Sequence, residues 1–233
     1  PYGIDGNAIF IGGYSAGAVA AIHSSYIDTI SDLPISITYI DLLTGQTVDF
    51  NPQDLVSTIG GNLEGDAGNY GFSSEVSGVV SFAGGINDIN WIDINDEPIV
   101  SCQGDADQIV NYNCGPGLNI PTVFTLCGAA EIHPKANIEG LTNDYLVFSG
   151  EGHEWCSAGN SSSLFLQALD FTSAFLFPLL PCNNTTSISE ENTRNKQLIR
   201  TTDMLGRNAN TINNGPLFYI FDDGSVEKKI IIN

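Results

Sequence analysis

The feature that most constrains the fold of this 233-residue chain is an apolar segment that runs directly into a serine flanked by glycines. Residues 8–12 have the composition of a buried strand, and the pattern Gly-Tyr-Ser-Ala-Gly follows at once at residues 13–17. Residues 16–28 are small and apolar along one side, which predicts a helix. A serine on a tight, strained turn from strand to helix needs neighbouring glycines, because its backbone contacts are close. We therefore predict that the Ser15 hydroxyl is exposed at the carboxyl end of a strand.

Short apolar runs bounded by glycine or proline recur along the chain and are predicted to be strands, at 78–82, 99–102, 122–126 and 145–148. Several of these runs are apolar on consecutive residues, which is typical of parallel strands covered on both faces. A second helix is predicted over 162–177, because Ser162 is a suitable N-cap for it. Strands that alternate with helices indicate the α/β class, with helices flanking a parallel sheet.

The longest apolar stretch, residues 164–180, is interrupted by Gln167, Asp170 and Pro178. A membrane-spanning helix needs about 18 to 20 consecutive apolar residues. We therefore predict that this stretch is a buried amphipathic helix and that the protein does not insert into a membrane.

Charge divides the chain into two parts. Residues 1–182 hold 21 acidic residues and one basic residue, Lys135, whereas residues 183–233 hold six of each kind. With the polar stretch that begins after Pro181, this break predicts a domain over 1–180, a linker over 181–197 and a small all-β module over 198–233. Within that module a turn-forming Asp-Gly pair predicts a β-hairpin.

The acidic first part excludes nucleic acid and anionic membranes as partners, because it repels their negative charge. The same charge disfavours polyanionic substrates and favours neutral or cationic ones. A solubility adaptation to salty or cold surroundings is the simpler explanation of this composition, and both explanations stay open here.

Three further features carry weaker signals. Residues 28–75 are rich in glycine without clear periodicity, and we interpret them either as a rim over a functional site or as a loop with no such role. The five cysteines lack zinc spacing, so we predict no structural metal site and leave the disulfide pairing open. The acidic stretch 93–97 offers the oxygen ligands that calcium prefers, but its irregular spacing favours a solvated turn.

A serine hydroxyl becomes a strong nucleophile only beside a general base, and a carboxylate must orient that base. The chain has three histidines. His23 lies two turns into the helix after Ser15 and is predicted to pack or face solvent, whereas His133 lies in a predicted loop with no strand leading directly to it. His153 follows the predicted strand 145–148 in a loop at the strand end, so we predict that His153 is the base.

The acid is expected after the strand 99–102, where Asp105 and Asp107 are both available. We predict Asp107, because a further turn brings it toward the histidine while Asp105 stays in the bend. An acidic loop without this role is the alternative. The order Ser15, Asp107, His153 along the chain is that of a serine triad of the α/β type.

Other residues near the candidate triad have predicted roles. The N-terminus of the helix after Ser15 directs the Ala16 N–H toward a developing oxyanion. Tyr14 lies beside the serine and Trp155 beside the histidine, and we predict that both contact substrate. For Trp91 and Trp155, packing is the alternative to lining a cleft.

Three segments, as a set, resemble a family of secreted bacterial carboxylesterases of the α/β-hydrolase type: residues 9–18, the glycine-rich residues 62–74, and Gln-Gly-Asp-Ala-Asp-Gln-Ile-Val at 103–110. The resemblance covers about residues 4–180 and implies the C-terminal half of an α/β-hydrolase parallel sheet with flanking helices. It implies a serine carboxylesterase that needs no cofactor and acts on small neutral esters or, as in some relatives, polyesters. The family motif selects Asp107 as the acid and His153 as the base. It has histidine where this chain has Gln103, a position outside the triad.

The end of the chain carries a second resemblance. Residues 198–232, which include Asp-Met-Leu-Gly-Arg at 203–207, resemble the C-terminal sorting domain of type IX secretion. This implies that the tail engages the type IX secretion machinery and that the protein is secreted or displayed at the cell surface. An ordinary small β module is the alternative.

In the hydrolase fold, several strands and a loop with a second oxyanion donor precede the strand before the nucleophile, yet only seven residues precede Ala8. We therefore expect the chain to be an N-terminally truncated part of a longer protein. By itself it is expected to hydrolyse esters poorly or not at all, because loss of one oxyanion donor costs on the order of a hundredfold or more in rate. Two other functions stay open, a serine exopeptidase of the same fold and a non-catalytic surface binding module.

Overall fold

The chain divides into two compact units, Pro1–Asn184 and Thr185–Asn233. A computed structural model describes residues 5–41, 43–64, 73–157, 159, 162–181, 196–203, 207–209, 215–222 and 224–231. Most of the predicted linker and Cys182 therefore lie outside the described residues. Each unit is considered by itself below.

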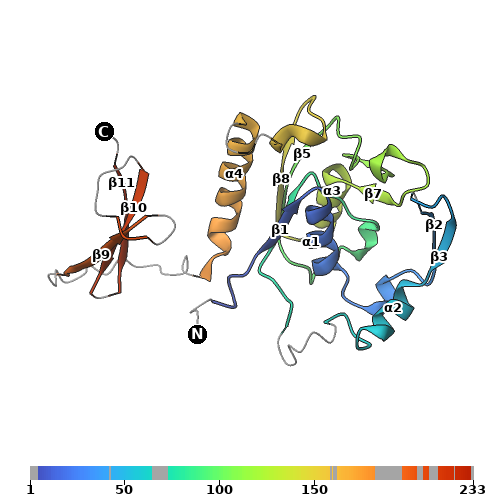
Figure 1. Ribbon diagram of the computed structural model, residues 1–233, viewed down its shortest axis with the longest axis horizontal. Coiled ribbons are helices and arrows are strands. Elements are labelled where there is room, and N and C mark those ends of the chain that lie inside the picture. The colour runs from blue at the N-terminus through green and yellow to red at the C-terminus, as the bar shows by residue number, and fades with distance from the viewer. Residues whose placement is uncertain are drawn as a thin grey trace. The chain divides into compact units, whose positions relative to one another are not determined.

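The first unit is built on a parallel sheet, as predicted, and this sheet has four strands (Figure 1). Its strands are β1 (Ile11–Tyr14), β4 (Val79–Phe82), β5 (Ile99–Gly104) and β8 (Asn143–Phe148), and they pair in the order β1-β4-β5-β8. Because all four strands run the same way, their carboxyl ends meet at one edge of the sheet. Ser15 and the loops that hold Asp107 and His153 leave the sheet at that edge.

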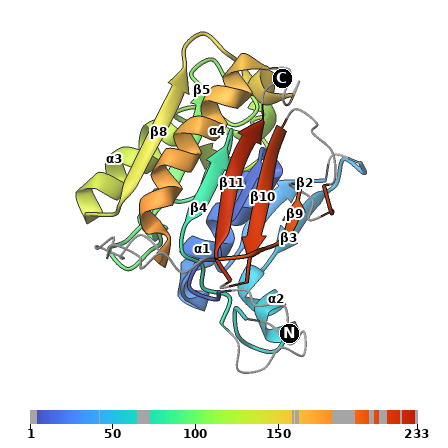
Figure 2. The same ribbon diagram turned by 90° about the vertical axis from the view of Figure 1, so that its left-hand side faces the viewer.

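Helices cover both faces of this sheet (Figures 1 and 2). The helices α1 (Ala16–Tyr26) and α3 (Ala129–Glu139) lie on one face, and α4 (Ser163–Leu176) lies on the other. Two apolar clusters follow from this layering, one that joins Ile22 of α1 to Ile132 of α3 and one in which Ala168 of α4 packs. The α/β prediction with flanking helices is thus confirmed, and the predicted helix over 162–177 corresponds to α4.

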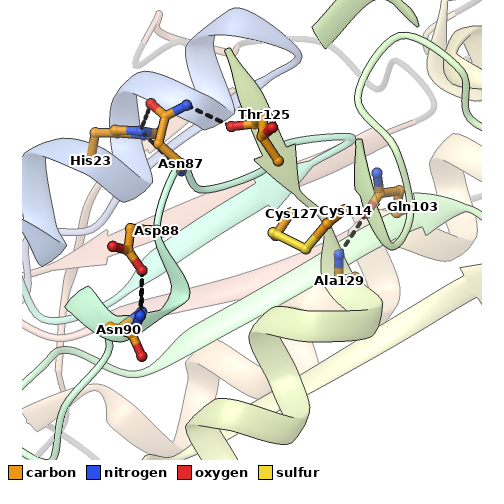
Figure 3. Close-up of a disulfide and its surroundings, with 9 residues drawn as sticks. All are labelled: His23, Asn87, Asp88, Asn90, Gln103, Cys114, Thr125, Cys127 and Ala129. Atoms are coloured by element: carbon orange, nitrogen blue, oxygen red, sulfur yellow. Dashed lines mark hydrogen bonds between the residues drawn. A yellow bond between two sulfur atoms is a disulfide. The ribbon is translucent and has the colours of Figure 1, made fainter. Parts of the chain in front are cut away.

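Two predictions for the segments around α3 were wrong. Residues 122–126 were expected to add a parallel strand, but β7 (Thr125–Cys127) pairs antiparallel with β6 (Cys114–Pro116) outside the main sheet. The disulfide Cys114–Cys127 joins directly opposed residues of this pair, so both strands are held in a short hairpin (Figure 3). His133 was expected in a loop but lies inside α3, which continues through Pro134.

The insertion at 28–75 contains regular structure despite its lack of periodicity. It holds an antiparallel pair, β2 (Ile37–Ile40) with β3 (Thr47–Phe50), and the helix α2 (Pro52–Thr58). The side chain of Asn51 caps α2 by accepting hydrogen bonds from the backbone N–H groups of Gln53 and Asp54 at 3.0 and 3.3 Å. Short 3-10 helices also occur in the first unit: η1 (Ile30–Asp32), η2 (Ile89–Trp91), η3 (Gly117–Asn119), η4 (His153–Cys156) and η6 (Phe177–Leu179).

The second unit contains a small antiparallel sheet in the order β11-β10-β9. Its strands are β9 (Leu198–Thr202), β10 (Gly215–Phe221) and β11 (Val226–Ile231), which match the predicted β segments. The turn between β10 and β11 includes Gly224 at φ 83°, a left-handed conformation that glycine adopts without strain. Over the part of the chain that the structure describes, no helix has the length and apolarity needed to cross a bilayer.

Candidate active site

The site begins at the turn between β1 and α1. Ser15 occupies this turn with φ 55° and ψ −122°, a conformation that costs energy for any residue with a side chain. A Cβ atom on Gly13 would lie 2.4 Å from the carbonyl carbon of Gly17, so only glycine fits where the strand passes the first turn of the helix. A Cβ atom on Gly17 would meet nothing within 4 Å. Of the two flanking glycines, Gly13 is therefore the one required by packing.

A chain of hydrogen bonds joins the three residues singled out from the sequence. The Oγ atom of Ser15 lies 2.7 Å from Nε2 of His153, and Nδ1 of His153 lies 2.7 Å from Oδ2 of Asp107. Asp107 and His153 are only 4% and 7% exposed. The carboxylate accepts a hydrogen bond from the N–H at Nδ1, which leaves the lone pair of Nε2 free to accept the serine hydroxyl proton.

The backbone that follows β5 holds the Asp107 carboxylate in place. Its second oxygen, Oδ1, accepts hydrogen bonds from the N–H groups of Ile109 and Val110 at 2.8 and 3.0 Å. The neighbouring Asp105 points elsewhere, because its carboxylate accepts hydrogen bonds from the hydroxyl of Ser149 and the N–H of Gly150. The structure thus brings Asp107 to His153, while Asp105 fastens the turn at the end of β8.

Gln103 of β5 connects this acid loop to the start of α3. It is buried at the end of β5, where its Nε2 donates to the carbonyl of Val110 and its Oε1 accepts from the N–H of Ala129, both at 2.8 Å (Figure 3). A Cβ atom on the adjacent Gly104 would lie 2.2 Å from the carbonyl oxygen of Glu151, so the acid and base loops are in direct contact. In the sequence, Gln103 stood out only as a departure from a family motif. Its bridging role could not be predicted, because it depends on partners at other positions along the chain.

Tyr14 contacts the base rather than projecting into open space. Its hydroxyl donates to the backbone carbonyl of His153 at 3.1 Å, and the two rings lie 5.2 Å apart. Burial, followed by the nearby Cys156 and Glu154, raises the pKa of the Tyr14 phenol to about 12. The phenol therefore stays protonated and keeps its donor role at all physiological pH values.

Trp155 lies in the apolar cluster under the base loop. Its indole ring is 5% exposed and packs against Phe82 and Phe148, with ring centroids 5.5 and 4.6 Å away. This burial favours packing over the substrate contact expected for it. Trp91 is half-buried and donates its indole N–H to the backbone carbonyl of Asp32 at 3.0 Å.

The Ala16 N–H is placed where a candidate oxyanion donor is expected. Ala16 is the first residue of α1, so its N–H is one of the four at that terminus that have no partner within the helix. The positive end of the helix dipole adds to the attraction for a negative oxygen next to Ser15.

The other two histidines are engaged away from Ser15. His23 lies between the carbonyl of Val19 and the side chain of Asn87, each 2.7 Å from a ring nitrogen (Figure 3). His133 is fully buried and stacks on Tyr145, and burial lowers its pKa to about 4. Both positions agree with packing roles and leave His153 as the histidine that contacts Ser15.

Three carboxylates form a cluster at the acidic stretch that follows η2. Oxygen atoms of Asp28, Asp93 and Asp96 lie within 4.8 Å of one another, which is spacing suitable for a cation. The same segment also makes the hydrogen bonds of a turn, with the Asp93 N–H donating to Asp96 at 2.6 Å and the Asn95 N–H donating to Asp93 at 2.7 Å. We describe it as an acidic turn, because nothing besides the carboxylates indicates a ligand there.

Comparisons with known proteins identify esterases of similar structure. A truncated carbohydrate esterase from gut microbiota aligns with a TM-score of 0.48 and 19% identity, over 76% of this chain and 62% of that one. The propionate-bound esterase Est2 of the planctomycete Thermogutta terrifontis aligns with a TM-score of 0.48 and 14% identity, over 76% of this chain and 58% of that one. Esterase PE8 aligns with a TM-score of 0.39 and 14% identity, over 76% of this chain and 53% of that one. The chain thus spans less than two thirds of each. No protein-family model matches the sequence, and no curated protein does.

Proposed function

We propose that this chain carries the catalytic triad of a carboxylic-ester hydrolase, with Ser15 as nucleophile, His153 as base and Asp107 as orienting acid. The observation that carries the proposal is the pair of 2.7 Å hydrogen bonds from Ser15 to His153 and from His153 to Asp107. Acyl transfer requires this arrangement, in which a strained serine at a strand-to-helix turn is hydrogen-bonded to a buried histidine and the histidine to a buried carboxylate.

The reaction follows from this geometry. Ser15 Oγ attacks the ester carbonyl carbon as its proton passes to Nε2 of His153, and Asp107 stabilises the imidazolium that forms. The carbonyl oxygen becomes an oxyanion that accepts a hydrogen bond from the Ala16 N–H. Collapse of this intermediate breaks the bond to the alcohol, which leaves with the proton from His153. A water molecule, deprotonated by His153, then attacks the acyl carbon, and the bond to Ser15 Oγ breaks as His153 returns the proton to that oxygen. Protein groups and water supply every proton, so no cofactor is invoked.

Charge suggests the substrate class. The first unit carries almost no basic residues, so a negatively charged acyl or alcohol group would find no partner there. We propose small neutral esters, with polyesters as a second candidate that the resemblance described above suggests. The half-buried Tyr14 borders the nucleophile and is the candidate substrate contact.

The test is covalent labelling and turnover of the same chain. We expect a fluorophosphonate probe to label the protein at Ser15 and p-nitrophenyl butyrate to be hydrolysed above the blank rate. Ser15→Ala removes both signals. Ser24→Ala, on the exposed side of the same helix, is the matched control and keeps both. Labelling without esterase activity, but with release of an N-terminal amino acid or dipeptide, indicates an exopeptidase. Absence of labelling indicates a non-catalytic binding module and overturns the proposal.

We further propose that residues 198–233, within the second unit, act as a sorting module for type IX secretion and that the protein is secreted or held at the cell surface. Two observations support this: the unit is compact in its own right, and its three strands form a small antiparallel sheet. In a bacterium with a type IX system, the chain with a signal peptide added should reach the medium or surface, and deletion of 185–233 should retain it in the periplasm. Equal export of both forms would contradict the role of the tail.

A further inference from the structure

The first unit contains a cavity of about 820 Å³ that is separate from the candidate active site. It lies beside α1 and is enclosed by the insertion at 28–75, the segment 87–91 and the tip of β7. None of the residues that the structure places around it belongs to the Ser15–His153–Asp107 chain. Cavities of this size are in the range that binds small organic molecules.

Most of the wall is apolar. Large apolar side chains from four different segments face the cavity, among them Ile27, Leu33, Phe50, Trp91 and Phe124. Phe124 is 45% exposed, although aromatic rings are usually buried where the fold allows it. Apolar surface that the fold itself does not cover is available to an apolar ligand.

The polar groups of the wall are hydrogen-bonded to one another, which holds the cavity in shape. The indole N–H of Trp91 donates to the carbonyl of Asp32, and the amide of Gln53 donates to the carbonyl of Leu33 at 2.7 Å. The first bond ties the insertion to the segment after β4, and the second ties two parts of the insertion, Leu33 and α2, to each other.

A second network closes the side next to α1. The amide nitrogen of Asn87 donates to the carbonyl of Thr125 at 2.7 Å, and the amide oxygen lies 2.7 Å from Nε2 of His23 (Figure 3). Both ring nitrogens of His23 are therefore already bound to oxygen atoms, one on Asn87 and one on Val19. The wall thus presents a preformed apolar surface rather than a set of free hydrogen-bonding groups.

Charge at the cavity selects the sign of the ligand. Two acidic residues, Asp32 and Asp88, line it, and among the residues that the structure places around it His23 alone is able to carry positive charge. The sole lysine of residues 1–182, Lys135, lies in α3 and pairs with Glu139. An anionic ligand would therefore be repelled by these acidic residues, and both ring nitrogens of His23 already face oxygen atoms of the protein, whereas a cation would be attracted.

We propose that this cavity is a second binding site, for a small organic cation with an apolar body, such as an ammonium group on an aromatic frame. The apolar wall buries the frame, and the ammonium group lies beside Asp88. This site is independent of the chemistry proposed at Ser15, because the two sets of residues do not overlap.

Three probes of matched shape test the proposal by titration calorimetry on the full chain: 2-naphthylmethylammonium, 2-naphthylmethanol and 2-naphthoate. We expect the cation to bind about threefold to tenfold more tightly than the neutral alcohol, and the anion to bind most weakly. Added salt should reduce the preference for the cation. Equal affinity for the cation and the alcohol, or no binding of either, overturns the proposal.

Four variants locate the site. Phe124→Ala should lower the affinities for the cation and for the alcohol together, by about tenfold, because it removes part of the apolar wall. Asp88→Asn should reduce the affinity for the cation alone, so that the cavity no longer prefers the cation to the alcohol. The fold should be kept, since the asparagine oxygen can still cap η2. Ile94→Ala, at an exposed position away from the cavity, is the control and should change nothing. Binding should also survive Ser15→Ala. Loss of binding in that variant would place the probe at the candidate active site instead.

Discussion

The hydroxyl of Tyr14 donates a hydrogen bond to the backbone carbonyl of His153, so the residue before the nucleophile holds the residue that activates it. Ser15 and His153 are separated by 138 positions along the chain. A direct link between their two loops limits the movement of the imidazole relative to Ser15, on which the efficiency of proton transfer depends.

Tyr14→Phe tests this positioning role. The variant keeps the ring that lies against His153 and loses only the hydrogen bond, which is worth about 1 kcal/mol. We expect kcat for p-nitrophenyl butyrate to fall about fivefold with KM nearly unchanged. The rate of fluorophosphonate labelling should fall by a similar factor. A rise in KM at constant kcat would show instead that the Tyr14 hydroxyl contacts substrate.

The two glycines beside Ser15 should respond in opposite ways to alanine. Gly13→Ala places a Cβ atom 2.4 Å from the backbone of Gly17, so the turn must shift, and we expect a loss of about 2 kcal/mol or more in the free energy of unfolding. Gly17→Ala places its Cβ in open space inside α1, where alanine stabilises a helix by about 0.5–1 kcal/mol. Urea denaturation of both variants measures the difference. Equal effects would contradict the close contact at Gly13.

Gln103→Leu should loosen the acid loop. The substitution leaves the carbonyl of Val110 and the N–H of Ala129 without a partner in the interior, at a cost of about 2 kcal/mol or more. Because Val110 also holds the carboxylate of Asp107, the rate of esterase turnover should fall together with stability. The control is Gln167→Leu on the exposed side of α4, and it should leave both quantities unchanged. Loss of stability at full activity would show that the loop stays in place without Gln103.

Local signals were sufficient to find the residues of the candidate site. Ser15, Asp107 and His153 each follow a strand of one parallel sheet, and the carboxyl ends of such strands meet at one edge. The position of each residue in a loop after a strand could therefore be inferred without knowing any long-range contact. The role of Tyr14 could not, because its partner is a backbone carbonyl far along the chain.

Some features that the sequence did not predict depend on long-range pairing. The run at 122–126 is as apolar as a sheet strand, but pairing with β6 and the bond between Cys114 and Cys127 place β7 in a hairpin instead. The elements of the insertion were missed for a different reason: β2 and β3 have 4 residues each and α2 has 7, which is too short for a clear periodicity in the sequence. The cavity beside α1 arises from segments distant in sequence and had no local signature.

The acidic turn after η2 predicts a dependence of stability on pH. Burial, together with the charges of Asp28, Asp93 and Glu97, raises the pKa of the Asp96 carboxyl from 3.8 to about 7. Between these two values the folded chain keeps a proton that the unfolded chain has lost. Asp96 therefore contributes its full stability below about pH 4, and this contribution is lost as the pH rises through about 7.

Asp96→Asn removes this loss while its side-chain oxygen can still accept the hydrogen bond from the Asp93 N–H. We expect the variant and the parent to be equally stable near pH 4 and the variant to be more stable above pH 7. After screening by solvent the gain should be on the order of 1 kcal/mol. Urea denaturation between pH 4 and pH 8.5 measures it, with Asp170→Asn on the exposed side of α4 as the control. A gain that does not vary with pH would mean that Asp96 is ionised throughout this range in the folded chain.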